Sequence, residues 1–168
     1  MADQLLTTAQ EDRMTWKPIS SAPRDVVERA KELAHRAHAG QVDKAGRPYI
    51  EHVARVAAAV SDDPDAEAIA WLHDVLEDCE SFAGDVYGFP GYIVGSVEAL
   101  SRTCYNNPKN YYRIIRSCPR TLRVKLADIA DNSSEDRLAL LDDKTAARLR
   151  RKYAKAIREL TKETDDGR

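Results

Sequence analysis

Apolar residues recur along most of this chain at the three- and four-residue spacing of an amphipathic helix. The pattern ends at glycine or restarts behind serine or aspartate followed by proline, which are common helix boundaries. No stretch of useful length alternates between apolar and polar residues, as a half-buried strand would. The sequence therefore predicts one all-α domain, a bundle of about six to eight helices, over residues 26–39, 49–60, 64–80, 92–101, 107–118, 121–132 and 142–163.

The same pattern predicts where the domain begins. Residues 1–22 are polar and lack helical periodicity, so we expect a flexible leader before a domain that covers residues 23–165. The leader has no apolar core of the kind that a signal peptide requires. No apolar run reaches the roughly 18 residues that a membrane-spanning helix needs. These features predict a protein of the cytoplasm with no membrane partner.

One predicted helix contains an unusual set of polar residues. The stretch AWLHDVLEDCE (residues 70–80) is apolar except for His73, Asp74, Glu77, Asp78 and its last residue. Charged groups are seldom buried unless they are paired or bind a metal. On a continuous helix, residues three and four apart share a face, so these groups would form one broad polar edge. Their like charges would repel one another, and a divalent cation would relieve that repulsion.

Two further polar residues lie in similar apolar surroundings. His52 is flanked by apolar residues in YIEHVARVAAAV, and Asp128 lies within VKLADIA. Taken singly, His52 could be a hydrogen-bonded core histidine and Asp128 a buried tie between helices. Together with His73 and Asp74 they could form one metal site, whose mixed ligands suit manganese, iron, zinc or cobalt. Glu77 and Asp78 would then be placed to orient a water molecule or to transfer a proton.

The overall charge excludes one class of partner. The formal net charge is −2 and the isoelectric point is near 6.1, so we expect no nucleic-acid surface, although a small anionic ligand fits. The cysteines, Cys79, Cys104 and Cys118, are odd in number and lack C-x-x-C spacing, which indicates reduced thiols. A homo-oligomer is compatible with the sequence.

Three motifs in this order carry a resemblance to a known family. They are HAGQVDKAGRPYIEH (residues 38–52), LHDVLED (72–78) and VKLADIADN (124–132). Together they resemble the HD-domain metal-dependent phosphohydrolases, and within these the hydrolase domain of the RelA/SpoT alarmone enzymes and their small hydrolase-only relatives. The resemblance covers roughly residues 26–133 and implies a single HD-type helical bundle.

The resemblance also implies roles for individual residues. His52, His73, Asp74 and Asp128 match the metal ligands, and the metal is usually Mn²⁺. Glu77 and Asp78 match the pair that activates water, while Lys44 and Asn132 match positions that line the substrate pocket. The reaction of the family removes pyrophosphate from the 3′ position of ppGpp or pppGpp.

This chain departs from the family pattern beside the expected substrate pocket. Asp43 replaces an arginine that packs on the guanine base, and an aspartate there would repel a nearby phosphate. Val53 replaces a proline, and Asp131 replaces a histidine. The chain could therefore hydrolyse another nucleotide or phosphoester. It could also be a nucleotide-binding sensor or partner-binding module without turnover.

Overall fold

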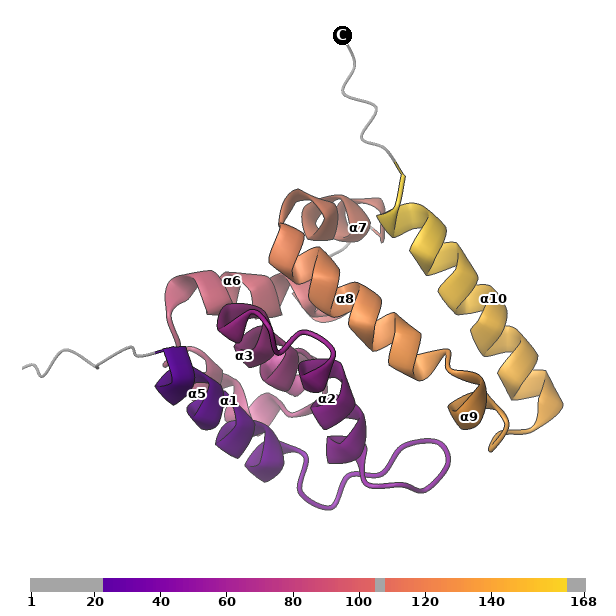
Figure 1. Cartoon of the computed structure of the whole chain (residues 1–168), viewed down its shortest axis with the longest axis horizontal. Helices are drawn as coiled ribbons and strands as arrows, with labels where there is room; N and C mark the ends of the chain where they lie inside the picture. The colour runs from indigo at the N-terminus through magenta and orange to yellow at the C-terminus, as the bar shows by residue number, and fades with distance from the viewer. Residues whose placement is uncertain (1–22, 105–107, 163–168) are drawn as a thin grey trace, which may run out of the picture.

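The computed structural model of the chain describes residues 23–104 and 108–162 (Figure 1). Within these residues it contains helices and no strand, which confirms the predicted all-α bundle. Seven of the α-helices have nine residues or more, and the others are single turns. The expected leader at residues 1–22 lies outside the described part, as do residues 163–165. The helices are α1 (Pro23–Ala37), α2 (Tyr49–Ala58), α3 (Pro64–Leu72), α4 (Val75–Asp78), α5 (Ala83–Val86), α6 (Gly91–Leu100), α7 (Pro108–Ser117), α8 (Pro119–Asn132), α9 (Glu135–Leu138) and α10 (Asp143–Leu160), with 3₁₀ helices at Glu80–Phe82 and Arg102–Cys104.

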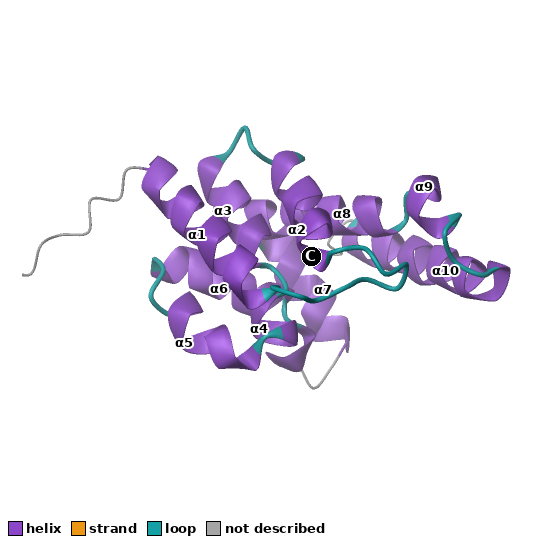
Figure 2. Ribbon diagram, turned by 90° about the horizontal axis from the view of Figure 1, so that it is seen from below, coloured by secondary structure: helices purple, strands orange, loops and turns teal. Residues whose placement is uncertain are grey.

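Helix α3 is the centre of the fold, and it packs against α1, α2, α6 and α8 (Figures 1 and 2). Its side chains are buried around the whole helix, including Ile69, Trp71 and Leu72. Burial of each such large side chain stabilises the fold by about 1.5–3 kcal/mol. Asp63 caps the start of α3 by accepting from the amides of Asp65 and Ala66, as the Asp-Pro signal predicts. The position of α3 is therefore fixed by packing on all sides.

The predicted continuous helix over residues 64–80 is wrong at one point. Helix α3 ends at Leu72, and α4 begins only at Val75. Between them His73 caps the end of α3, and Asp74 adopts φ −108° and ψ −2°, which leaves the regular helix. Neighbouring side chains on a straight helix diverge by about 100°. The break allows His73 and Asp74, although adjacent in sequence, to face the same point.

A loop of residues 38–48 connects α1 to α2 and passes beneath them in Figure 1. Gly40 and Gly46 both have φ of 77°, a left-handed conformation that favours glycine. A β-bridge between Val42 and Pro48 closes the loop. Helices α9 and α10 enclose a second small apolar cluster formed by Leu138, Ala146 and Leu149. None of the described helices is long and apolar enough to cross a membrane.

Candidate functional site

A cavity of about 290 Å³ lies where the 38–48 loop, α4, α8, α9 and α10 meet. Its floor carries carboxylates, its rim carries lysine and arginine, and one wall is apolar. Helices α8 and α10, which run alongside each other, both contribute to the cavity (Figure 1). Lining residues include Asp43, Lys44, Tyr49, Asp74, Glu77, Asp78, Arg102, Lys125, Asp128, Asn132, Arg137, Leu138, Leu141, Leu149, Lys152 and Tyr153.

The four predicted metal ligands come together at the floor of this cavity. Ligand atoms of His52, His73 and Asp74 all lie within 4.8 Å of one another, a spacing that could hold a metal ion. Asp128 adjoins this group, because its Oδ1 lies 3.4 Å from Nε2 of His52 and 3.9 Å from Nε2 of His73. Helix α2 supplies His52, the break after α3 supplies His73 and Asp74, and α8 supplies Asp128.

Hydrogen bonds on the far side of each imidazole fix its orientation. Nδ1 of His52 donates to Oδ2 of Asp131 at 2.6 Å, and Nδ1 of His73 donates to the carbonyl of Ala70 at 2.7 Å. A carboxylate and a carbonyl can only accept, so both Nδ1 atoms carry hydrogen. Both Nε2 atoms therefore point toward the carboxylates. Metal-binding histidines in proteins are oriented by this kind of outer hydrogen bond.

The donor set fits a cation at this position. Both imidazoles are only 1% exposed, and Nε2 of His73 makes no acceptable hydrogen bond although it lies 2.9 Å from Oδ2 of Asp74. Burial alone would favour the neutral ring, but Asp74 and Asp128 outweigh it and raise the pKa of His73 to about 9. A proton on Nε2 thus supplies positive charge between these carboxylates. A divalent cation would supply it more completely.

Charged neighbours keep the carboxylates ionised in spite of burial. Burial opposes ionisation of Asp128, yet Lys125 and His52 hold its pKa well below the usual range. Burial also opposes ionisation of Asp74, and His73 lowers its pKa in the same way. The Tyr49 hydroxyl donates to Asp74 at 2.5 Å. Both side chains are therefore anionic at neutral pH and can bind a metal.

Glu77 and Asp78 line the cavity from α4, and the fold holds each by one hydrogen bond. Oε2 of Glu77 accepts from the backbone amide of Arg102 at 3.0 Å. Oδ2 of Asp78 accepts from the side-chain amide of Gln41 at 3.1 Å. Each carboxylate keeps one oxygen without a direct partner among the described residues. A water molecule in the cavity could reach these oxygens.

The two predicted substrate-binding residues differ in their surroundings. Lys44 lines the cavity and pairs with no described carboxylate, so its charge is available to a ligand. Asn132 donates to Oδ1 of Asp128 at 2.6 Å, and the same nitrogen lies 3.5 Å from Nε2 of His52. Asn132 thus contacts the ligand cluster directly as well as lining the cavity.

The charge of Asp43 is compensated within the protein, which corrects the expectation that it would repel a nearby phosphate. Its Oδ1 accepts from the backbone amides of Ala45 and Arg47, and its Oδ2 accepts from Arg137 at 3.0 Å. Burial opposes ionisation of Asp43, but these two amides and Arg137 lower its pKa. A ligand in the cavity meets a neutralised ion pair at this position.

Sequence reasoning did not assign roles to several residues that complete the site. Tyr49, Gln41 and Asp131 each bond directly to a predicted ligand or catalytic carboxylate. All three lie inside the quoted motifs, Gln41 and Tyr49 in residues 38–52 and Asp131 in residues 124–132. Arg102 and Arg137 lie outside the motifs, and only the three-dimensional structure brings them to the cavity.

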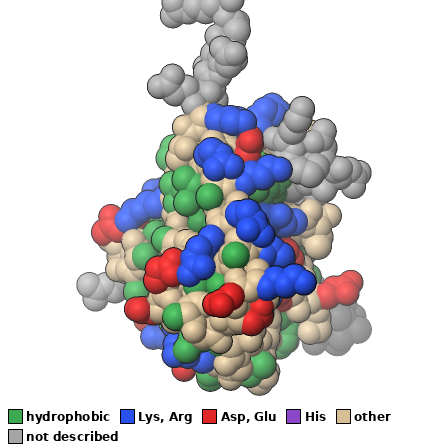
Figure 3. Space-filling model, turned by 90° about the vertical axis from the view of Figure 1, so that its right-hand side faces the viewer, with side chains coloured by type: hydrophobic (Ala, Val, Ile, Leu, Met, Phe, Trp, Pro, Cys, Tyr) green, Lys and Arg blue, Asp and Glu red, His purple; other side chains and the backbone are tan. Residues whose placement is uncertain are grey.

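Basic residues continue from the rim of the cavity along α10. Lysine and arginine side chains gather on the face of the molecule that α10 forms (Figure 3). Burial lowers the pKa of Lys152, and the positive charges of Arg102, Lys44 and Lys125 lower it further. These cations therefore lie near one another at the cavity. Their mutual repulsion would be relieved by an anionic ligand.

Comparison with protein-family models gave no match. Comparison with curated proteins gave several relatives with about the same identity. A guanosine-3′,5′-bis(diphosphate) 3′-pyrophosphohydrolase of Vibrio cholerae is 32% identical over 126 residues, which cover 67% of this chain and 18% of that protein. A protein of the same name from Haemophilus influenzae is 31% identical over 146 residues, covering 76% and 20%. A probable GTP pyrophosphokinase of Mycobacterium leprae is 32% identical over 124 residues, covering 64% and 15%.

The chain thus spans about a fifth or less of the length of these relatives. The matches agree with the resemblance carried by the three motifs. Over about two thirds of its length the chain belongs to the family of the RelA/SpoT-type alarmone hydrolases, and it corresponds to one part of those longer proteins.

Proposed function

We propose that this chain is a metal-dependent phosphohydrolase of nucleotides, with removal of pyrophosphate from the 3′ position of ppGpp or pppGpp as the first reaction to test. The observation that carries the proposal is the convergence of His52, His73, Asp74 and Asp128. The two carboxylates of this group line one cavity together with Glu77 and Asp78. Binding alone would not require a second pair of carboxylates next to the ligand cluster. The names of the related proteins support the choice of substrate.

We propose Mn²⁺ as the metal, held by the two imidazoles and the carboxylates of Asp74 and Asp128. The buried Nε2 of His73 without an acceptable hydrogen bond supports a cation at this position. Mixed nitrogen and oxygen ligands suit manganese among the first-row metals. When bound, a divalent cation supplies Lewis-acid polarisation of a phosphoryl group and lowers the pKa of water.

The protein's own residues would supply the remaining steps. Glu77 and Asp78 orient a water molecule and accept its proton as it attacks the phosphorus. The bond between phosphorus and the 3′ oxygen breaks, and that oxygen takes up a proton as it leaves. Lys44 compensates the charge of the departing pyrophosphate. The arrangement of the carboxylates on α4 and the lysine on the opposite loop supports these roles.

The two kinds of wall in the cavity support a nucleotide as the substrate. The cations of the rim suit phosphate groups, and Lys44 and Lys152 make no ion pair with a described carboxylate. Apolar side chains also line the cavity, including Leu138, Leu149 and Tyr153, and these suit the flat face of a base or a sugar edge. A nucleotide other than a guanine alarmone is the second candidate, because Asp43 stands where the family has its base-packing arginine.

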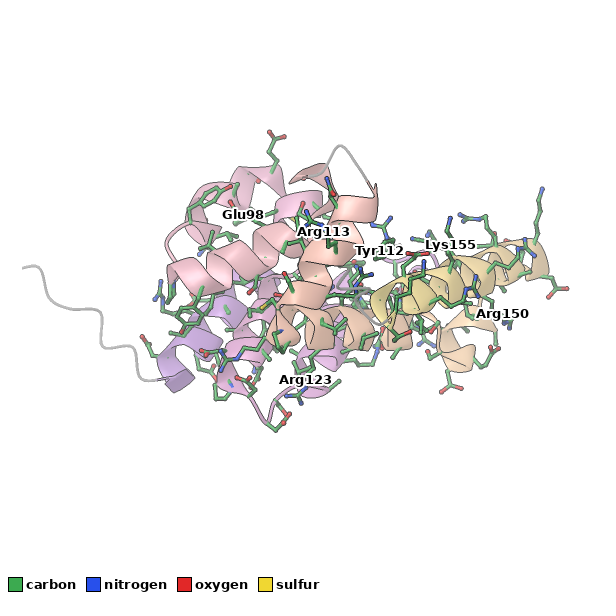
Figure 4. All side chains as sticks on the ribbon, turned by 90° about the horizontal axis from the view of Figure 1, so that it is seen from above. Glu98, Tyr112, Arg113, Arg123, Arg150 and Lys155 are labelled. Carbon is green, nitrogen blue, oxygen red and sulfur yellow. The ribbon has the colours of Figure 1, made fainter. Side chains whose placement is uncertain are left out.

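A manganese-supplemented activity screen tests the proposal. It would compare ppGpp, pppGpp, other purine nucleotides and a generic phosphodiester, with Glu77→Ala beside the wild type. Glu98→Ala is a matched control, since this glutamate lies on α6, away from the cavity (Figure 4). We expect pyrophosphate from ppGpp with the wild type and the control only.

Other outcomes of the screen separate the alternatives. Turnover of a different nucleotide alone would keep the mechanism and change the substrate. No turnover of any compound by a protein that binds Mn²⁺ would favour a nucleotide-binding sensor over an enzyme.

A further inference from the structure

Arg137 joins two carboxylates from distant parts of the chain, Asp131 of α8 and Asp43 of the 38–48 loop. Its Nη1 donates to Oδ2 of Asp131 at 2.5 Å, and its Nη2 donates to Oδ2 of Asp43 at 3.0 Å. The three side chains are between 8% and 15% exposed, so solvent screens the ion pairs only weakly. The contact with Asp43 spans 94 positions of sequence.

One of these carboxylates acts on a predicted metal ligand. Oδ2 of Asp131 is also the acceptor for Nδ1 of His52, and Arg55 holds the remaining oxygen at 2.5 Å. Two arginines thus fix the plane of the carboxylate that orients the imidazole. Partners of this kind typically change metal affinity by about 10- to 100-fold when they are removed.

The other carboxylate holds the loop that carries Lys44. Oδ1 of Asp43 accepts from the amides of Ala45 and Arg47, which closes a tight turn around Lys44. Arg137 ties this turn to α9 through the second oxygen. The ion pair therefore helps to hold the loop in position, and Lys44 takes its place in the cavity from that position.

We propose that Arg137 is a positioning residue that sets two properties separately, metal affinity through Asp131 and His52, and binding of the phosphate-bearing ligand through Asp43 and Lys44. The inference rests on the proposed function for both properties, since the metal and the phosphate-bearing ligand are both part of that proposal. The planar guanidinium of Arg137 suits this role, because its rigid geometry allows it to donate to two carboxylates at once.

The experiment titrates Mn²⁺ and inorganic pyrophosphate into the purified chain by calorimetry, so that it does not depend on turnover. For Arg137→Met we expect the Kd for Mn²⁺ to rise about tenfold or more, and pyrophosphate binding to weaken as well. For Asp43→Asn we expect weaker pyrophosphate binding with the Kd for Mn²⁺ unchanged. Arg137→Lys should recover part of both affinities, because an ammonium can pair with one carboxylate at a time.

Arg150→Met is the matched control. Arg150 also pairs with a carboxylate of α9, Glu135, but it is 48% exposed and does not line the cavity (Figure 4). We expect this variant to bind both ligands as the wild type does. Circular dichroism shows whether Arg137→Met folds. If it does not, the same titrations of Arg137→Lys test the proposal.

A folded Arg137 variant with wild-type affinity for Mn²⁺ would overturn the proposal. An Asp43→Asn variant that loses metal affinity as strongly as Arg137→Met would overturn the separation of the two properties. A wild type that binds Mn²⁺ but hydrolyses no nucleotide would contradict the proposed function while leaving the metal titrations of Arg137 decisive.

Discussion

Lys125 donates to Oδ2 of Asp128 at 2.7 Å, although both residues are buried. The ammonium therefore neutralises one oxygen of a carboxylate whose other oxygen faces the two histidines of the metal-ligand cluster. Lys125 thus compensates the charge of Asp128 from α8 itself, and the proposed cation at the histidines would compensate it a second time.

Substitution Lys125→Met should therefore destabilise the metal-free protein more than the metal-loaded one. Removing one partner of a buried ion pair costs about 3–5 kcal/mol, because the other charge stays buried. In EDTA we expect the free energy of unfolding to fall by an amount near the lower end of this range, since His52 also contacts Asp128. With saturating Mn²⁺ we expect a smaller loss. Urea unfolding followed by circular dichroism measures both. Equal losses in the two conditions would show that no cation compensates Asp128.

Metal affinity should increase with pH because of His73. Its pKa of about 9 means that the metal-free protein carries a proton on Nε2 at pH 7.5. A metal ion must displace that proton, so the Kd for Mn²⁺ should fall about tenfold for each pH unit between 7 and 8.5. Calorimetry in buffers of different ionisation enthalpy would detect about one released proton. Release of none would mean that Nε2 is not a ligand.

The same proton affects folding in the opposite direction. The pKa of His73 is higher in the folded state than its ordinary value near 6.5. Its contribution to stability is therefore complete below about pH 6.5 and is lost as the pH rises through about 9. The metal-free protein should unfold at lower urea concentration at pH 9.5 than at pH 7, and added Mn²⁺ should reduce the difference.

Substitution Asp74→Ala should abolish metal binding and turnover while the domain stays folded. Asp74 is a partly exposed cavity residue, and its loss leaves the Tyr49 hydroxyl facing a cavity that water can enter. The expected cost in stability is therefore about 1–2 kcal/mol. Metal content and thermal unfolding test this, with exposed Asp136→Ala as the control. Activity in a folded, metal-stripped Asp74→Ala protein would defeat the mechanism.

Gln41 should act on catalysis through Asp78. The carboxylate of Asp78 can only accept, so the Gln41 amide nitrogen faces it and Oε1 faces Nδ1 of His38 at 2.7 Å. His38 therefore donates and fixes the amide. Substitution Gln41→Leu should lower kcat about tenfold with the Kd for Mn²⁺ unchanged. Gln41→Glu keeps the oxygen that accepts from His38 but loses the amide that donates to Asp78, so its kcat should be lowered at least as much. A wild-type kcat in either variant would exclude this role for Gln41.

Much of the fold could be predicted because its boundaries have local causes. Asp63 and Pro64 start α3 as expected, and the long helices coincide with apolar periodicity. The single-turn helix α5 was not predicted, since the glycine-rich segment around it has no periodicity. The break at Asp74 was also missed, because no glycine or proline marks it in the sequence and apolar residues continue on both sides.

The candidate site could be predicted only where a buried polar residue is recognisable from the apolar residues around it in the sequence. His52, His73 and Asp128 stand out as polar residues within apolar helices, and the structure brings them together. Their roles stay predictions. Arg137 gives no such signal, because it lies in a charged four-residue helix and its partner Asp43 is 94 positions away. Charge compensation over that separation depends on the fold rather than on local sequence.

The central position of α3 has a consequence for distant substitutions. His73 directly follows Leu72, and neighbours surround α3, so a change of volume in the core acts directly on the position of this helix. A cavity created by Ile69→Val would displace the end of the helix by a small amount, in a core packed as densely as a crystal. The affinity for a metal should therefore depend on how well the core is packed. Core substitutions that contact none of the proposed ligands should also change it.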